Sequence, residues 1–136
     1  MNLEQALKIL GGDFAKCRVN RSRAFSDRED GGLSVCFHYT KMYGSNVWWT
    51  SETFLAVDSC NYLIIALQNR GLLVLPRKVL IGYWTDLKVS TLKSGRRNIR
   101  IKEEYGKIYL YNCSNQRPID VTEHLHPCEV SDSQPF

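Results

Sequence analysis

Cysteine and histidine side chains gather in two short segments, and together they could bind a zinc ion. Cys36 and His38 alternate along "LSVCFHYT" and so share one face of an expected strand. The second segment, "HLHPC", supplies His124, His126 and Cys128. Thiolate and imidazole groups are the ligands of structural zinc sites. The chain has no Cys-x-x-Cys pair, however, and none of the usual ligand spacings. We therefore interpret these residues as a buried thiol and partly exposed histidines, with zinc as the alternative, and expect no cofactor.

Carboxylates and a lysine indicate a second kind of chemistry, metal-dependent cleavage of nucleic acid. Such sites bind Mg²⁺ through carboxylates and use a lysine to steady the attacking water or the leaving charge. "DLK", from Asp86 to Lys88, with Asp58 earlier in the chain, resembles the acidic-x-Lys arrangement of restriction-type nucleases. In that family the arrangement lies within a core strand, whereas here it follows an expected helix and leads into a loop. There is also no nucleophile elbow and no phosphate-binding glycine loop. A nuclease is therefore an alternative only, and we assign no catalytic residue.

The clearest pattern is the segment "RNIRIKEEYGKIYLY" at residues 97–111. With Tyr105-Gly106 as a two-residue turn, it predicts a β-hairpin in which Arg100 lies opposite Tyr111. Because side chains alternate along a strand, the aliphatic residues of the hairpin share one face. These are Ile99, Ile101, Ile108 and Leu110. The other face carries Arg100, Lys102, Tyr109 and Tyr111. The first face should complete the core, and the second should face outward.

Cations and aromatic rings on one face are typical of nucleic-acid-binding surfaces. Cations neutralise phosphates, while flat rings stack on bases. In the alternative interpretation, the tyrosines only cover the aliphatic stems of arginine and lysine on a solvated sheet. Further basic residues could extend such a surface at the entrance of the hairpin and near the N-terminus. They are Lys93, Arg96, Arg97, Arg18, Arg21 and Arg23.

Positive charge is concentrated in about a quarter of the chain. The net charge is +4, but residues 70–102 contain nine basic residues against Asp86 alone. Such asymmetry favours a polyanionic partner. A solvated surface of mixed charge is the other interpretation.

The remaining segments indicate a small α+β protein. Asn2 can cap a short helix with leucines at i, i+4 and i+7. The alternating segment 33–40 predicts a half-buried strand, which we expect to pair with the strand "VWWT" after a turn at Gly44. The apolar runs "YLIIALQ" and "LLVLP", joined around Gly71, predict a hairpin buried on both faces. We expect a mostly antiparallel, twisted sheet of β-hairpins with a few short helices packed on it.

Two neighbouring tryptophans, Trp48 and Trp49, should point to opposite faces of their strand. One should lie in the core, and we expect a helix to cover the other rather than leave it exposed at a site. At 136 residues the chain suits one domain, to which we assign residues 1–126. Residues 127–136 should form a flexible C-terminal tail.

Cysteine usage and hydropathy indicate a cytoplasmic protein. The five cysteines are an odd number in no tight framework, so we expect reduced thiols. The N-terminus, "MNLEQALKIL", has no basic n-region and no small-residue cleavage site. No apolar run approaches the roughly 20 residues of a membrane helix, and we expect no membrane partner.

Four segments follow one another in an order that resembles a known type of module. They are "YTKMYGSNVWWTSETF", "NYLIIALQNRGLLVLPRKVL", "RRNIRIKEEYGKIYLY" and "IDVTEHL". From Thr40 to Leu125 the chain resembles an uncharacterised small α+β module of prokaryotic restriction- and defence-associated proteins. In that module an aromatic pair after a glycine turn, a buried hairpin ending in a proline-initiated helix, and a basic strand recur in this order. The resemblance implies a role near DNA or in a defence complex.

Taken together, these patterns predict a non-catalytic nucleic-acid-binding module, with DNA as the expected polymer. The first alternative is a protein-interaction or assembly subunit whose basic face meets an acidic partner. The second is the Mg²⁺-dependent nuclease described above.

Overall fold

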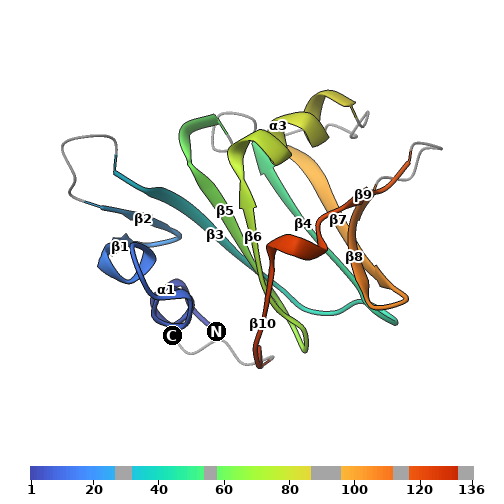
Figure 1. Cartoon of the computed structure of the whole chain (residues 1–136), viewed down its shortest axis with the longest axis horizontal. Coiled ribbons are helices and arrows are strands. Elements are labelled where there is room, and N and C mark those ends of the chain that lie inside the picture. The colour runs from blue at the N-terminus through green and yellow to red at the C-terminus, as the bar shows by residue number, and fades with distance from the viewer. Residues whose placement is uncertain (27–31, 54–57, 87–95, 112–116, 132–136) are drawn as a thin grey trace.

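The computed structural model describes residues 1–26, 32–53, 58–86, 96–111 and 117–131 of the chain. In these ranges the protein is α+β, with ten strands in two sheets and short helices packed against them (Figure 1). All strand pairs are antiparallel except one. The predicted α+β class with mostly antiparallel pairing is therefore confirmed, although the strands divide between two sheets.

The first sheet has the strand order β1-β2-β3-β5-β6-β10. Its strands are β1 (Arg18–Asn20), β2 (Arg23–Phe25), β3 (Ser34–Thr40), β5 (Tyr62–Leu67), β6 (Gly71–Pro76) and β10 (Leu125–Pro127). The second sheet has the order β4-β7-β8-β9. Its strands are β4 (Val47–Thr53), β7 (Arg96–Glu104), β8 (Lys107–Tyr111) and β9 (Ile119–Asp120). The helices are α1 (Leu3–Leu10), α3 (Arg77–Asp86) and two 3₁₀ turns, η1 (Phe14–Lys16) and η2 (Thr122–His124).

The central strands of the first sheet are buried on both faces because they lie between two layers. Alternate residues of β5 point to opposite sides: Leu63 and Ile65 join one hydrophobic cluster, while Ile64 and Ala66 join another. The first cluster also contains Trp48 and the aliphatic residues of β7 and β8, so it fills the space between the sheets. The second contains the apolar face of α1. The layers therefore run from α1 through the first sheet to the second sheet.

The β5–β6 hairpin forms as predicted and lies between β3 and β10 in the first sheet. Gly71 begins β6 at a φ of 148°, a conformation that favours glycine. A Cβ at this position would lie 2.5 Å from the carbonyl oxygen of His126. Glycine at 71 therefore also permits the close approach of β10, which pairs Pro127 with Gly71 and His126 with Leu72.

The predicted pairing of β3 with β4 is wrong. Both edges of β3 are occupied within the first sheet, by β2 on one side and by β5, in parallel, on the other. The segment after Thr40 instead crosses to the second sheet, turning at Gly44 and Asn46, whose φ angles are both 60°. There β4 pairs with β7, which places Trp48 in the core between the sheets.

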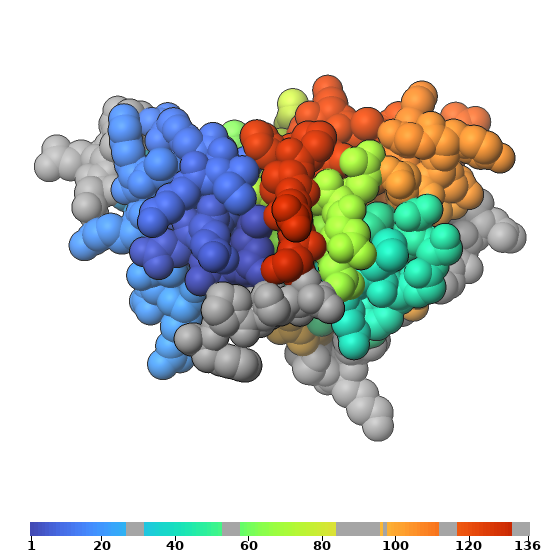
Figure 2. Space-filling view, turned by 90° about the horizontal axis from the view of Figure 1, so that it is seen from below, coloured from blue at the N-terminus to red at the C-terminus, as the bar shows by residue number. Residues whose placement is uncertain are grey.

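The C-terminal segment packs against the rest of the protein as far as Val130, so this part of it is not a free tail. Pro127 belongs to β10, and Val130 is only 1% exposed because it packs in the cluster with α1. The backbone N–H of Asn69 donates to the carbonyl of Val130 at 3.0 Å. Figure 2 shows this C-terminal segment (red) between the N-terminal region (blue) and the residues around 70 (yellow-green). Residues 132–136 lie outside the described ranges.

Across the described ranges, none of the helices is long and apolar enough to cross a membrane.

Candidate nucleic-acid interface

The β7–β8 hairpin has the predicted register. Arg100 lies opposite Tyr111, and Lys102 lies opposite Tyr109. Tyr105 and Gly106 form the turn with positive φ angles of 53° and 77°, as a type I′ turn requires. The aliphatic face is fully buried against the first sheet, and each of its members has an exposed fraction of 0%: Ile99, Ile101, Ile108 and Leu110. The basic and aromatic residues therefore point away from the core.

The pairing of β4 with β7 adds a tryptophan to that face. Trp49 lies opposite Arg100, which in turn lies opposite Tyr111, so the three residues form one row across β4, β7 and β8. The next row contains Val47, Lys102 and Tyr109. Figure 1 shows the three strands side by side at the end of the molecule farthest from β1. We call this surface the outer face; it comprises Trp49, Arg96, Arg100, Lys102, Tyr109 and Tyr111.

The two tryptophans lie on opposite faces of β4, as alternation requires. Trp48 is 1% exposed, and its indole N–H donates to the carbonyl of Gln68 at 3.0 Å. Trp49 is 43% exposed, which corrects the prediction that a helix covers it. Its ring instead packs against Tyr43 with the ring centroids 5.7 Å apart and the planes tilted by 32°. This contact orients an indole that remains accessible from outside.

Arginine and lysine side chains are held in place on the outer face by neighbouring groups. The Arg96 guanidinium donates to the Ser51 carbonyl at 2.6 Å and to the Ser51 hydroxyl at 2.9 Å. The Lys102 ammonium lies 5.2 Å from the centre of the Tyr111 ring and 3.5 Å from a Glu104 carboxylate oxygen. The tyrosine therefore does contact the cation beside it, as the alternative interpretation of this face expects.

Carboxylates lie toward the turn of the hairpin rather than beside Arg100. Asp120 on β9 is 3.9 Å from the Lys107 ammonium. Hydrogen bonds from the Thr122 hydroxyl and backbone N–H, and then the charge of Lys107, lower the pKa of the Asp120 carboxyl. Among the described residues, none forms an ion pair with Arg100. Positive charge on the outer face is therefore less compensated at Arg100 than at Lys102, which pairs with Glu104.

The N-terminal basic residues do not extend this surface. Arg18, Arg21 and Arg23 belong to β1, β2 and the turn between them, at the opposite end of the long axis (Figure 1). Lys93 lies outside the described residues, and only the backbone of Arg97 is described, within β7. Sequence reasoning expected a helix over Trp49 and did not consider Tyr43. The pairing of β4 with β7 that places them beside Arg100 has no local signal in the sequence.

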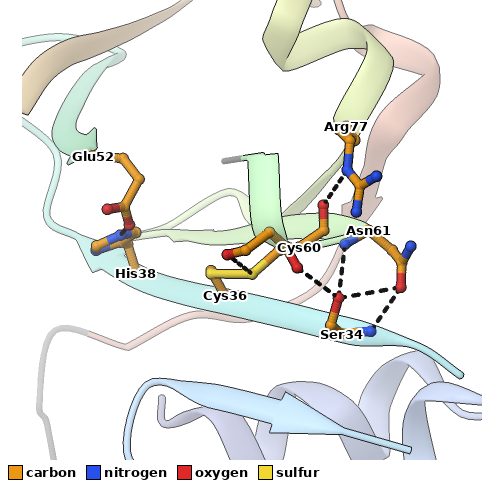
Figure 3. Close-up of a disulfide and its surroundings, with 8 residues drawn as sticks. Ser34, Cys36, His38, Glu52, Cys60, Asn61 and Arg77 are labelled. Carbon is orange, nitrogen blue, oxygen red and sulfur yellow. Dashed lines mark hydrogen bonds and ion pairs between the residues drawn. A yellow bond between two sulfur atoms is a disulfide. The ribbon is translucent and has the colours of Figure 1, made fainter. Parts of the chain in front are cut away.

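The predicted zinc ligands do not come together. Cys36 forms a disulfide with Cys60, and His38 Nε2 pairs with the Glu52 carboxylate, as Figure 3 shows. His126, on β10, is exposed. Cys128 follows β10, and burial raises the pKa of its thiol. In the part of the chain that the structure describes, no three metal-ligating side chains form a group. The zinc alternative is therefore wrong for this set, which also includes His124.

A disulfide also replaces the reduced thiols expected at Cys36 and Cys60. The parallel pairing of β3 with β5 sets Cys36 opposite Leu63, three residues after Cys60, and so brings the two cysteines together. Ser34 and Asn61 exchange backbone and side-chain hydrogen bonds of 2.8–3.2 Å beside the disulfide (Figure 3). Because disulfides persist in oxidising surroundings, cysteine usage no longer argues for a cytoplasmic location.

Of the three residues predicted for a nuclease site, the structure describes the side chain of Asp58 alone. Asp58 is exposed, and Asp86 is the last residue of α3, with only its backbone described. Lys88 lies outside the described ranges. Their arrangement as a Mg²⁺ site stays a prediction from the sequence.

Comparisons with protein families, with curated proteins and with solved structures found no match to this chain. The resemblance to a defence-associated module therefore also stays a prediction.

Proposed function

We propose that this chain is a non-catalytic nucleic-acid-binding module that contacts its ligand through the outer face of the second sheet. The observation that carries the proposal is the row Trp49, Arg100 and Tyr111, which alternates aromatic and cationic side chains across three strands. Cations bind phosphates, and aromatic rings stack on bases in a manner that tolerates many sequences. Both kinds of contact are thus available on one surface.

We further propose that the outer face binds nucleic acid without reading its sequence. Arg96, Arg100 and Lys102 can contact phosphates, which positions a ligand but does not read its sequence. Each phosphate contact contributes about 0.7–0.9 to the slope of the logarithm of affinity against the logarithm of salt concentration. DNA as the polymer and a role in prokaryotic restriction or defence are retained as predictions from the sequence. A cytoplasmic location also stays a prediction, although the disulfide removes the support that it had from cysteine usage.

The experiment compares two variants that remove the same charge at different places. Arg100→Gln/Lys102→Gln removes two positive charges from the outer face, while Lys8→Gln/Arg21→Gln removes two exposed charges distant from it. Fluorescence anisotropy with a short labelled oligonucleotide measures affinity from low to moderate salt. We expect the outer-face variant to bind at least about tenfold more weakly at low salt, with a salt slope reduced by about 1.4–1.8.

Equal affinity and equal slope in the two variants would contradict the proposal, because any binding would then reflect net charge alone. If neither the wild type nor the variants bind nucleic acid, the acidic protein partner considered above becomes the leading function.

A further inference from the structure

We infer that the outer face takes a single strand of nucleic acid, laid across β4, β7 and β8, with bases stacked separately on Trp49 and Tyr111. The phosphate between those bases lies at Arg100. This inference rests on the proposed function and specifies the ligand of the same site. The observation that supports it is again the row in which Arg100 lies between Trp49 and Tyr111.

The spacing of the aromatic residues selects against a stacked ligand. Trp49 and Tyr111 lie on strands that flank β7, and neighbouring strands are about 4.8 Å apart, so their backbones are roughly 10 Å apart. Bases stacked on one another rise about 3.4 Å per nucleotide. Consecutive stacked bases therefore cannot each place a face on one of these rings. Bases that have separated from one another can do so, and only unpaired strands offer them readily.

The two aromatic rings differ in how ready they are for such contacts before a ligand binds. Trp49 is held by its tilted contact with Tyr43, and both side chains remain exposed, at 43% and 39%. The Tyr111 ring is half-buried and carries the Lys102 ammonium over its face. A base stacking on Tyr111 takes the place of that ammonium, which also lies 3.5 Å from a Glu104 carboxylate oxygen. Trp49 is therefore positioned before binding, whereas stacking on Tyr111 requires the Lys102 side chain to move.

Charge determines where the strand runs on the face. Glu104 and Asp120 lie toward the turn end of the hairpin, where each is close to a lysine. A phosphate at that end would approach two carboxylates, whereas Arg100 has no carboxylate partner among the described residues. A path across the strands at Arg100, continuing toward Arg96, keeps the phosphates near cations and away from these carboxylates. Hence the nucleic-acid strand crosses the sheet at the row of Trp49, Arg100 and Tyr111.

The test compares four ligands that differ in base pairing, in the presence of bases, or in the sugar together with the thymine methyl group. These are a twelve-nucleotide thymidine strand, its uridine counterpart, the thymidine strand in a duplex with its complement, and a single strand of equal length without bases. With the wild-type chain, anisotropy should show the two base-bearing single strands binding about tenfold or more tightly than both the duplex and the baseless strand, since one base stack alone contributes roughly that factor. The two base-bearing strands distinguish DNA from RNA.

Variants then locate the stacking contacts. Trp49→Ala and Tyr111→Ala should each weaken binding of the thymidine strand roughly 5- to 100-fold, because each removes one stacking surface. Trp49→Phe and Tyr111→Phe should retain most of the affinity. Both alanine variants should keep the wild-type salt slope, since neither removes a cation.

The outcomes separate this inference from the proposed function. If the duplex or the baseless strand binds as tightly as the thymidine strand, the single-strand inference is overturned, while a charge-dependent nucleic-acid site remains. If none of the four ligands binds, the proposed function itself fails. The ligand comparison uses the wild-type chain alone, so it decides the question even if an alanine variant does not fold.

Discussion

Trp48→Ala is expected to lower the free energy of unfolding by about 3–5 kcal/mol, whereas Trp49→Ala should change it by well under that amount. Trp48 is 1% exposed between the two sheets, so its loss leaves a cavity in the core. It also leaves the Gln68 carbonyl without its indole donor. Trp49 is 43% exposed, and its replacement removes contact with Tyr43 from the surface. Unfolding in urea, followed by circular dichroism, measures both values.

The adjacent positions serve as controls for each other, because the same substitution is made one residue apart in β4. Trp48→Phe separates the two contributions at that site, since it restores most of the apolar volume but not the hydrogen bond to Gln68. A larger loss of stability for Trp49→Ala than for Trp48→Ala would mean that the faces of β4 are reversed. The outer face as defined here would then be the buried one.

Cys36→Ser/Cys60→Ser is expected to lower the free energy of unfolding by about 3 kcal/mol, because the disulfide closes a loop between residues 24 apart in sequence. For a chain of this size that loss corresponds to a fall in Tm of about 10 °C. The disulfide joins β3 to the segment before β5, and both cysteines are 4% exposed. Thermal unfolding with and without a reductant measures the effect.

The matched control is Cys17→Ser/Cys128→Ser, which replaces two half-buried free cysteines and should have a much smaller effect. Reductant should lower the Tm of the wild type toward that of Cys36→Ser/Cys60→Ser and leave that variant unchanged. Rapid alkylation of the unreduced protein in denaturant, followed by peptide mapping, should leave Cys36 and Cys60 unmodified. If both are alkylated under these conditions, the disulfide does not form in solution.

Local patterns were sufficient to predict two of the hairpins, β5–β6 and β7–β8. In β7 and β8 the Tyr105-Gly106 turn fixes the register, and the strict alternation of aliphatic with basic or aromatic residues fixes which face is buried. The β5–β6 hairpin was predicted in the same way, from two apolar runs joined near Gly71. Contacts between neighbours in sequence carry this information directly.

Pairings between distant strands were not predictable in this way. The alternation in β3 and β4 indicates strands but does not identify their partners, so the parallel β3–β5 pair and the β4–β7 pair were missed. The Cys36–Cys60 disulfide and the position of Trp49 beside Arg100 both follow from those pairings. The same reason applies to β10, whose three residues pair with β6 across about fifty residues of sequence.

The indole N–H signals of the tryptophans test the central claim most directly, because Trp48 and Trp49 report on opposite faces of one strand. Two-dimensional ¹H–¹⁵N spectra of the labelled protein would be recorded while the twelve-nucleotide thymidine strand is added, with signals assigned from Trp→Phe variants. We expect the Trp49 indole signal to shift progressively to saturation and the Trp48 signal, whose N–H is bonded to Gln68 in the core, to stay in place. Saturable binding that leaves the Trp49 signal unmoved, with shifts confined to β1 and β2, would contradict the outer face as the binding site.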